Sequence, residues 1–174
     1  MTSYAPSFLS PPWFKKIKSV YDQPKHLQLL YRGSEHEFNA EMFHDLCDNR
    51  GATLTICKSE HDFIFGLSTT VPWQRNDNWV TNTGESFVFR VESSNGGMKL
   101  VKARLRDMKT EAILHSPSRL PSFDSFQLYD KAHQNDNWTS VDYEYYNIPE
   151  DIKIDLKTYW GGAELFKLKE LEVY

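Results

Sequence analysis

Short alternating segments dominate this sequence from residue 53 onward, and they constrain the fold more than any other feature. Apolar residues alternate with polar or small ones over residues 53–58, 63–68, 86–91 and 99–105. Alternation with a period of two is typical of β-strands with one buried and one solvated face. The turn signal Ser94-Asn95-Gly96-Gly97 lies between two of these segments and predicts an antiparallel hairpin.

Two amphipathic helices are expected before these strands. The first begins at Pro11, after the N-cap Ser10, and carries a stripe of apolar residues at three- and four-residue steps before Pro24 ends it. The second spans residues 40–49, with Asn39 as its cap. Its predicted inner face is Met42, Phe43, Leu46 and Cys47, and Gly51 is the expected left-handed stop.

The remaining segments complete the expected fold. Short strands are predicted at residues 27–31, 111–115 and 126–129, with a loop over 116–125 and a polar stretch over 130–142. Residues 163–174 predict a terminal strand with an irregularity near Glu170. Helices early and strands late favour an α+β fold, a mainly antiparallel two-sheet β-sandwich flanked by a few helices.

Length and charge exclude several classes of protein. The chain has 174 residues, enough for one domain, and its 24 acidic and 20 basic side chains give a net charge of −4. A nucleic-acid coat needs a clear basic excess, so no nucleic-acid partner is expected. We also expect no transmembrane segment, no signal peptide and a cytoplasmic protein, since no long apolar run occurs and only two cysteines are present.

Several short motifs follow one another in a characteristic order. They are LLYRGS (29–34), MFHDLC (42–47), NRGATL (49–54), FIFG (63–66), PW (72–73), TGESFVF (83–89) and FKLKELEVY (166–174). This ordered set resembles the TLDc domain, the module of oxidation-resistance proteins and of nuclear-receptor coactivator relatives. The positions that match the motif of this family are Gly33, Gly51, Gly66, Trp73, Gly84 and Glu85.

The resemblance covers residues 27–174, so residues 1–26 are expected to be a lead-in with an amphipathic helix. It implies a two-sheet sandwich, a role in oxidative-stress protection and binding to the peripheral part of the vacuolar proton pump. Some relatives recognise phosphoinositide head groups, so these are a candidate ligand. The chain departs from the family pattern at LPSFDS (120–125), at residues 141–146, where a cysteine is missing, and at Tyr174. A different partner surface is therefore plausible.

No arrangement of residues indicates catalysis, a metal or a cofactor. Glu85 opens a strand after Gly84, but a single carboxylate without a partner is poor evidence for acid–base work. The six histidines show no zinc-binding spacing, and His36 and His44 are expected at the surface or at an edge. We therefore expect a protein that is not an enzyme.

The two cysteines leave a chemical alternative open. A thiol-based antioxidant acting through Cys47 or Cys57 needs an exposed thiol with a lowered pKa. Cys47 is expected near the end of a helix, where the dipole raises a thiol pKa, and Cys57 in a strand. Packed, inert thiols are the favoured interpretation.

Lysines give the better candidate for binding. Lys15, Lys16 and Lys18 lie on the first helix, and Lys167 and Lys169 lie near the C-terminus. If these faces converge, they offer a site for an acidic partner or a phosphoinositide head group. The alternative is a solvated face of mixed charge, because Glu164, Glu170 and Glu172 interleave with the C-terminal lysines.

The leading functional hypothesis is a non-catalytic protein-interaction module, linked to stress protection and docking on the vacuolar proton pump. A fixed structural subunit of a large cytoskeletal or ciliary assembly is the alternative within the same class. Such a protein would be cytoplasmic and peripheral to a membrane or to the cytoskeleton.

Overall fold

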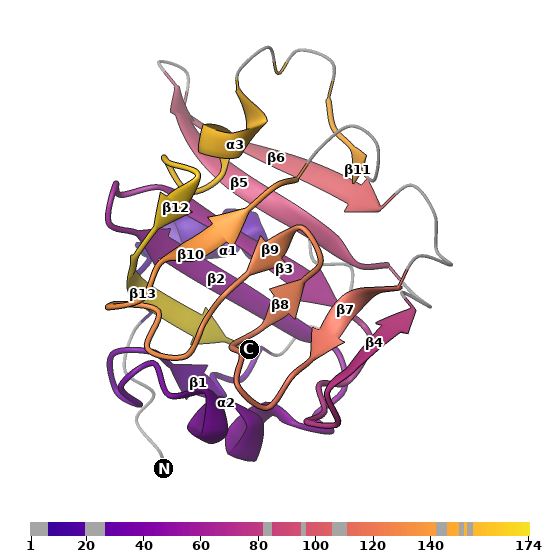
Figure 1. Ribbon diagram of the computed structural model, residues 1–174. Helices are drawn as coiled ribbons and strands as arrows, with labels where there is room; N and C mark the ends of the chain where they lie inside the picture. The colour runs from indigo at the N-terminus through magenta and orange to yellow at the C-terminus, as the bar shows by residue number, and fades with distance from the viewer. Residues whose placement is uncertain are drawn as a thin grey trace.

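The computed structural model describes residues 7–19, 27–81, 85–94, 97–105, 111–141, 146–149, 152 and 155–174. Within these residues the strands form two antiparallel sheets, one of seven strands and one of six, which face each other as layers of a sandwich (Figure 1). The two-sheet sandwich with a few helices is therefore confirmed.

The seven-stranded sheet forms the back layer of the sandwich in Figure 1. Its order is β1 (Tyr31–Arg32), β13 (Leu168–Val173), β2 (Thr53–Ser59), β3 (Ile64–Thr69), β5 (Phe87–Ser94), β6 (Gly97–Leu105) and β11 (Tyr146–Asn147). The predicted hairpin around residues 60–62 is confirmed as β2 and β3. The pairing of β5 with β6 extends to Ser94 and Gly97, while residues 95–96 of the predicted turn lie outside the described part of the chain.

The six-stranded sheet forms the front layer of the sandwich. Its order is β12 (Leu165–Phe166), β10 (Asn137–Thr139), β9 (Phe126–Gln127), β8 (Ser122–Phe123), β7 (Glu111–His115) and β4 (Asn78–Thr81). The predicted loop over residues 116–125 contains β8, and the polar stretch over 130–142 contains β10, so both were incompletely assigned. Strands of two or three residues are too short to display a periodic pattern.

The C-terminal segment passes from one sheet to the other. β12 pairs with β10 in the smaller sheet, whereas β13 pairs with β2 in the larger one. The register of β13 against β2 shifts between Leu168 and Glu170, which confirms the predicted irregularity near Glu170. The strand predicted at residues 27–31 is shorter than expected, because only its last residue, Tyr31, belongs to β1.

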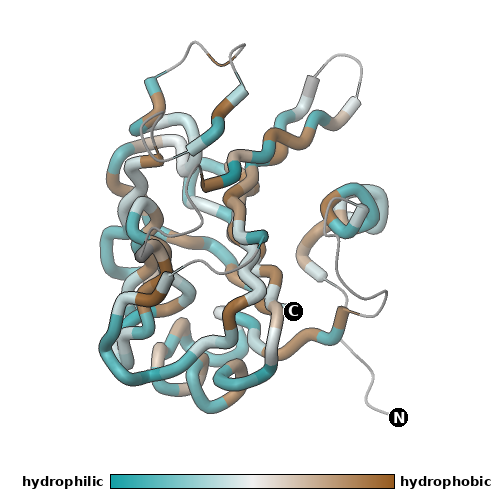
Figure 2. Tube along the Cα trace, turned by 90° about the vertical axis from the view of Figure 1, so that its right-hand side faces the viewer, coloured by the Kyte–Doolittle hydropathy of each residue, from teal (hydrophilic) through white to brown (hydrophobic). Residues whose placement is uncertain are grey.

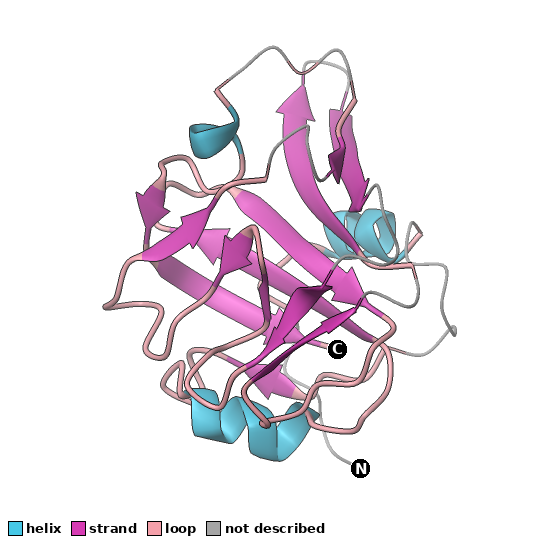
Figure 3. Cartoon of the chain, turned by 45° about the vertical axis from the view of Figure 1, so that its right-hand side comes forward, coloured by secondary structure: helices cyan, strands magenta, loops and turns pink. Residues whose placement is uncertain are grey.

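Within the described part of the chain, three short helices lie around the sandwich (Figure 3). They are α1 (Pro11–Lys18), α2 (Ala40–Cys47) and α3 (Leu156–Tyr159). The cap of α2 is confirmed, because the Asn39 side chain accepts a hydrogen bond of 2.8 Å from the backbone N–H of Met42. The prediction that Met42 faces inward is wrong: its side chain is 40% exposed, whereas Phe43 and Cys47 are fully buried.

Two apolar cores lie on opposite faces of the larger sheet. The inner core fills the space between the sheets, where the Phe65 ring lies 5.2 Å from the Phe126 ring and 5.4 Å from the Phe166 ring. The outer core lies under α1, which covers the far face of the sheet (Figure 2). Leu54 and Ile56 of β2 belong to this outer core. The expectation of one solvated face for β2 and β3 is therefore wrong, since α1 and its flanking residues cover that face.

A buried ion pair joins the neighbouring strands β1 and β13, which come first and last along the chain in the larger sheet. Arg32 and Glu172 are cross-strand partners of β1 and β13, and Glu172 is fully buried. The Arg32 guanidinium donates to Oε1 of Glu172 through Nε at 3.0 Å and through Nη2 at 2.8 Å. Burial alone would lower the pKa of Arg32, but the hydrogen bond and charge of Glu172 raise it above its ordinary value.

The N-terminal segment completes the surroundings of Glu172. Its Oε2 accepts a hydrogen bond of 2.6 Å from the Ser7 hydroxyl and one of 2.7 Å from the Tyr174 hydroxyl. The backbone N–H of Phe8 donates to Oε1 at 3.2 Å. The alternative of a solvated face of mixed charge included Glu172. For Glu172 that interpretation is wrong, because Ser7 and Phe8 bond to this carboxylate and the Arg32 guanidinium neutralises it.

Replacing Glu172 tests this arrangement. Glu172→Gln removes the buried counter-ion of Arg32 and leaves the half-exposed Glu35, 2.8 Å from Nη1, as its charged partner, so the free energy of unfolding should fall by about 2–4 kcal/mol. Glu170→Gln is the matched control, because Glu170 is two residues away, partly exposed and bonded to Ser34. We expect the control to lose about 1 kcal/mol or less in urea unfolding. Equal losses in the two variants would contradict the account.

Candidate interaction surface

The residues that match the family motif have structural roles where the structure describes them. The Trp73 side chain is buried, and its indole N–H donates to the Thr53 hydroxyl at 2.8 Å. Gly66 sits in β3, where a Cβ would overlap the backbone of Thr55 and the ring of Phe89. Gly33 leaves room for the Phe38 ring in the same way. These positions shape the core rather than a binding surface.

The remaining motif positions lie near turns. Gly51 has a φ of +85°, a conformation that favours glycine, although α2 already ends at Cys47. Gly84 lies outside the described residues. Glu85 is exposed, and its carboxylate lies 3.7 Å from the Arg104 guanidinium. An exposed carboxylate beside a surface arginine has the arrangement of a surface ion pair.

The two cysteines are buried within the inner core. Both thiols are free, and neither Cys47 nor Cys57 has measurable exposure. Burial is the main cause that raises the pKa of each thiol well above its ordinary value. A thiolate is the nucleophilic form, so both residues are poorly suited to redox chemistry in the folded chain.

His44 is buried, in contrast to the surface or edge position expected for it. Its Nδ1 lies 2.7 Å from the Asp48 carboxylate, and its Nε2 lies 2.9 Å from the Ser116 carbonyl. Asp48 in turn accepts a hydrogen bond of 3.1 Å from Arg75. The imidazole therefore joins the end of α2 to the segment after β7. Among the described residues, no group of three or more histidine, cysteine or acidic side chains is arranged to hold a metal ion.

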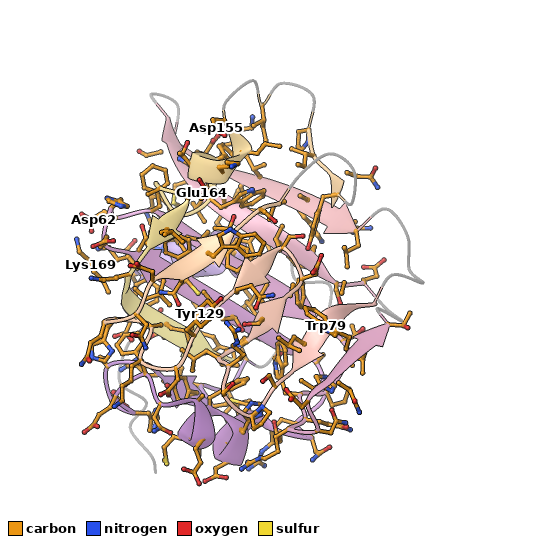
Figure 4. The ribbon with its side chains drawn as sticks, in the orientation of Figure 1. Asp62, Trp79, Tyr129, Asp155, Glu164 and Lys169 are labelled. Carbon is orange, nitrogen blue, oxygen red and sulfur yellow. The ribbon has the colours of Figure 1, made fainter. Side chains whose placement is uncertain are left out.

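The candidate lysines divide between α1 and the start of β13, which lies beside the β2–β3 turn. The ammonium group of Lys169 lies 3.0 Å from the Asp62 carboxylate, which also bonds to Lys58 at 3.0 Å (Figure 4). These two lysines lower the pKa of Asp62. Lys167 lies between β12 and β13, where its backbone N–H donates to Glu60 of the β2–β3 turn at 3.0 Å.

The lysines of α1 face solvent more freely. Within the described part of the chain, Lys15, Lys16 and Lys18 form no ion pair. Lys157 provides a contrast, because its ammonium group bonds to Glu164 at 3.1 Å. The structure therefore places one free group of lysines on α1, and beside the β2–β3 turn it pairs Lys169 of β13 and Lys58 of β2 with Asp62.

A cavity connects these two regions. It has a volume of about 340 Å³ and is lined by Trp13 of α1, residues 61–63 of the turn, Ile64 of β3 and residues 90–93 of β5. Asp62, the partner of Lys58 and Lys169, is one of the lining residues. The volume of the cavity lies in the range of ligand-binding pockets, which are about 300–1,000 Å³.

Arg90 is the central charged residue of this cavity. Its guanidinium lies between the rings of Phe63 and Tyr159, at 4.2 Å and 4.3 Å from their centroids. It also donates a hydrogen bond to the Tyr159 carbonyl, while the Tyr159 hydroxyl donates to Glu92 at 2.7 Å. Burial lowers the pKa of Arg90. These contacts hold the wall of the cavity in place before any ligand arrives.

The sequence predicts a strand over residues 86–91, which corresponds to β5, but it contains no signal for this cavity. Its lining comes from segments up to 80 positions apart, from Trp13 to Ser93, and no local motif joins them. The sequence also carries exposed Trp79 on β4, at the opposite side of the molecule from Asp62 and Lys169 (Figure 4). The longest helices of the described residues, α1 and α2, have eight residues each, too few to span a bilayer.

The rate of thiol modification tests directly whether Cys47 and Cys57 are unreactive in the folded chain. In the folded chain, an aromatic disulfide reagent at pH 8 should modify Cys47 and Cys57 on the order of a hundredfold more slowly than in the unfolded chain. Burial both blocks access and disfavours the thiolate, so the same sample in urea serves as the control. Rapid modification of one thiol in the folded chain would show that it is accessible and ionised.

Comparison with known proteins identifies the family. The model of the TLDc domain matches residues 3–174, which include α1 as well as both sheets. None of the curated proteins compared with the chain is similar enough to count as a match. The ordered motifs, the two-sheet sandwich and this match agree, and the chain belongs to the TLDc domain family.

Proposed function

We propose that this chain is a non-catalytic docking module that binds a protein assembly. The observation that carries the proposal is the TLDc match over residues 3–174, essentially the whole chain. Family membership favours a protein-interaction module, and the arrangement of the reactive side chains supports it. Cys47 and Cys57 lie in the core, and His44 is bonded at both ring nitrogens.

The family resemblance suggests the peripheral part of the vacuolar proton pump as the partner, with stress protection as the downstream effect. This partner implies a cytoplasmic location next to a membrane. The lysines of α1 suit an anionic surface, since each lysine near such a surface contributes about 1 kcal/mol of attraction. A phosphoinositide head group would therefore bind in the same region as an acidic protein.

A pull-down from native lysate tests the docking proposal. The full chain, used as bait, should recover a stoichiometric assembly, identified by mass spectrometry. Subunits of the vacuolar proton pump would support the family partner, whereas cytoskeletal or ciliary proteins would support the alternative of a fixed structural subunit. Failure to recover any stoichiometric partner would contradict docking.

The chemical alternative needs its own control. Cys47→Ala combined with Cys57→Ala removes both thiols and leaves the surface unchanged, because both residues are buried. If the chain acts by docking, this variant should protect cells against peroxide as well as the unmodified chain does. Loss of protection, with the fold intact by circular dichroism, would favour the thiol-based antioxidant.

The contribution of the α1 lysines can be measured separately. Replacing Lys15, Lys16 and Lys18 together by glutamine should weaken binding to the captured assembly, and the loss should shrink as salt is raised. Lys157→Gln is the matched control, because Lys157 is a surface lysine already paired with Glu164. Equal effects of the triple variant and the control would show that the α1 lysines make no specific contribution.

A further inference from the structure

The cavity beside α1 contains an unpaired strand edge. β3 pairs with β5 from Ser68–Phe87 to Ile64–Val91, and β3 begins at Ile64. β5 continues beyond Val91 to Ser94, where it pairs only with β6 among the described residues. Residues 92–94 therefore have a neighbouring strand on one side and an open edge on the other.

The hydrogen-bond pattern shows which backbone groups face this open edge. The carbonyl of Phe63 accepts a hydrogen bond of 3.0 Å from Ser59 of β2, so the backbone of Phe63 faces β2. Backbone groups of successive strand residues face opposite sides, so Ile64 faces β5 and its partner Val91 faces β3. Ser93, two residues further on, faces the same side as Val91. Its N–H and C=O therefore point to the open edge, and Ser93 lines the cavity.

The walls around this edge fit an apolar side chain. Trp13, Phe63, Ile64 and Val91 provide apolar surface, and the Phe63 ring is held against the Arg90 guanidinium. Glu92 is held by the Tyr159 hydroxyl. A preformed wall lowers the entropic cost of binding, because few side chains need to be ordered when the ligand arrives.

The charges around the opening favour an acidic ligand. Beside the β2–β3 turn, Lys58 of β2 and Lys169 of β13 share one carboxylate, Asp62, so this ion-paired cluster carries one positive charge in excess. Lys16 adds a further charge, because it lies one turn after Trp13 on the same side of α1. Within the cavity, Arg90 and Glu92 balance each other.

We propose that this cavity binds an extended, acidic peptide segment of a protein partner. The segment adds as a strand along the open edge of β5, exchanges backbone hydrogen bonds with Ser93, and places a large apolar side chain between Trp13 and Phe63. Strand addition of this kind obtains affinity from backbone hydrogen bonds and specificity from side-chain pockets. This inference rests on the proposed docking function and locates its site.

A peptide selection provides the test. A displayed library of random linear twelve-residue peptides is selected on the full chain, and the enriched peptides are measured by fluorescence anisotropy. Ser93→Pro removes the N–H that faces the open edge, and the β5–β6 ladder does not use that N–H. We expect Ser93→Pro to weaken binding about tenfold or more, because a peptide carbonyl loses its donor. Ser93→Ala keeps the N–H and should change affinity by about twofold or less.

A second measurement uses the unmodified protein and does not depend on the fold of a variant. Each enriched peptide is N-methylated at one position at a time. Among residues 92–94 only Ser93 turns its carbonyl to the open edge, so one peptide N–H donates to β5 and affinity should fall when that single position is methylated. Equal affinity of all N-methylated peptides would overturn strand addition. So would a library in which no peptide binds the chain better than it binds Ser93→Pro.

The same variant separates this proposal from the docking function. If the unmodified chain captures an assembly from lysate and Ser93→Pro captures it equally well, the docking function stands and this site is wrong. If the unmodified chain captures nothing, the docking function itself is wrong. Loss of the assembly in Ser93→Pro, with capture retained in Ser93→Ala, supports both.

Discussion

The ion pair and hydrogen bonds of the buried Glu172 carboxylate are the interactions on which the outer core and α1 depend. A charged group in a protein interior needs a counter-ion and hydrogen bonds at each of its oxygens. Arg32 is the counter-ion, and Ser7, Phe8 and Tyr174 donate the hydrogen bonds. These hydrogen bonds therefore require Ser7 and Phe8 to lie next to the C-terminal residue Tyr174.

The position of α1 follows from this requirement. Once residues 7–9 lie over Glu172, the helix that begins at Pro11 is directed across the outer face of the sheet (Figure 2). Ile17 is then fully buried in the outer core, and the Phe14 ring lies 5.1 Å from the Tyr174 ring. Trp13 comes to line the cavity beside β5. A polar contact at one end of the sheet thus helps to form a candidate binding site at another.

Much of the sandwich could be predicted from the sequence, because its longer strands carry local signals. The hairpin of β2 and β3 shows alternation on both sides of a polar turn, and β13 shows an interruption near Glu170. Strands of two or three residues, such as β8 and β12, carry too few residues for a period to be visible. Glu172 was misplaced because a charge within a strand resembles a solvated position until its partner, 140 residues away, is known.

The candidate site was harder to predict for a related reason. The lysines of α1 and the C-terminal Lys167 and Lys169 were identified from charge alone, and the structure brings their surroundings together through Trp13 and Asp62. The open edge at Ser93 depends on where β3 begins relative to the end of β5, a matter of register that no residue type specifies. In the sequence Arg90 resembles any charged strand residue, because its contacts with the rings of Phe63 and Tyr159 are known only from the structure.

Photo-cross-linking in native lysate tests the central claim, docking through the face beside α1, most directly. A photoreactive phenylalanine analogue replaces Trp13 at the cavity in one version of the chain and exposed Trp79 on β4 in another. The account predicts that position 13 yields one dominant adduct, whose cross-linked peptide is acidic, and that position 79 does not yield it. Adducts at position 79 alone, or none at either position, would contradict the account.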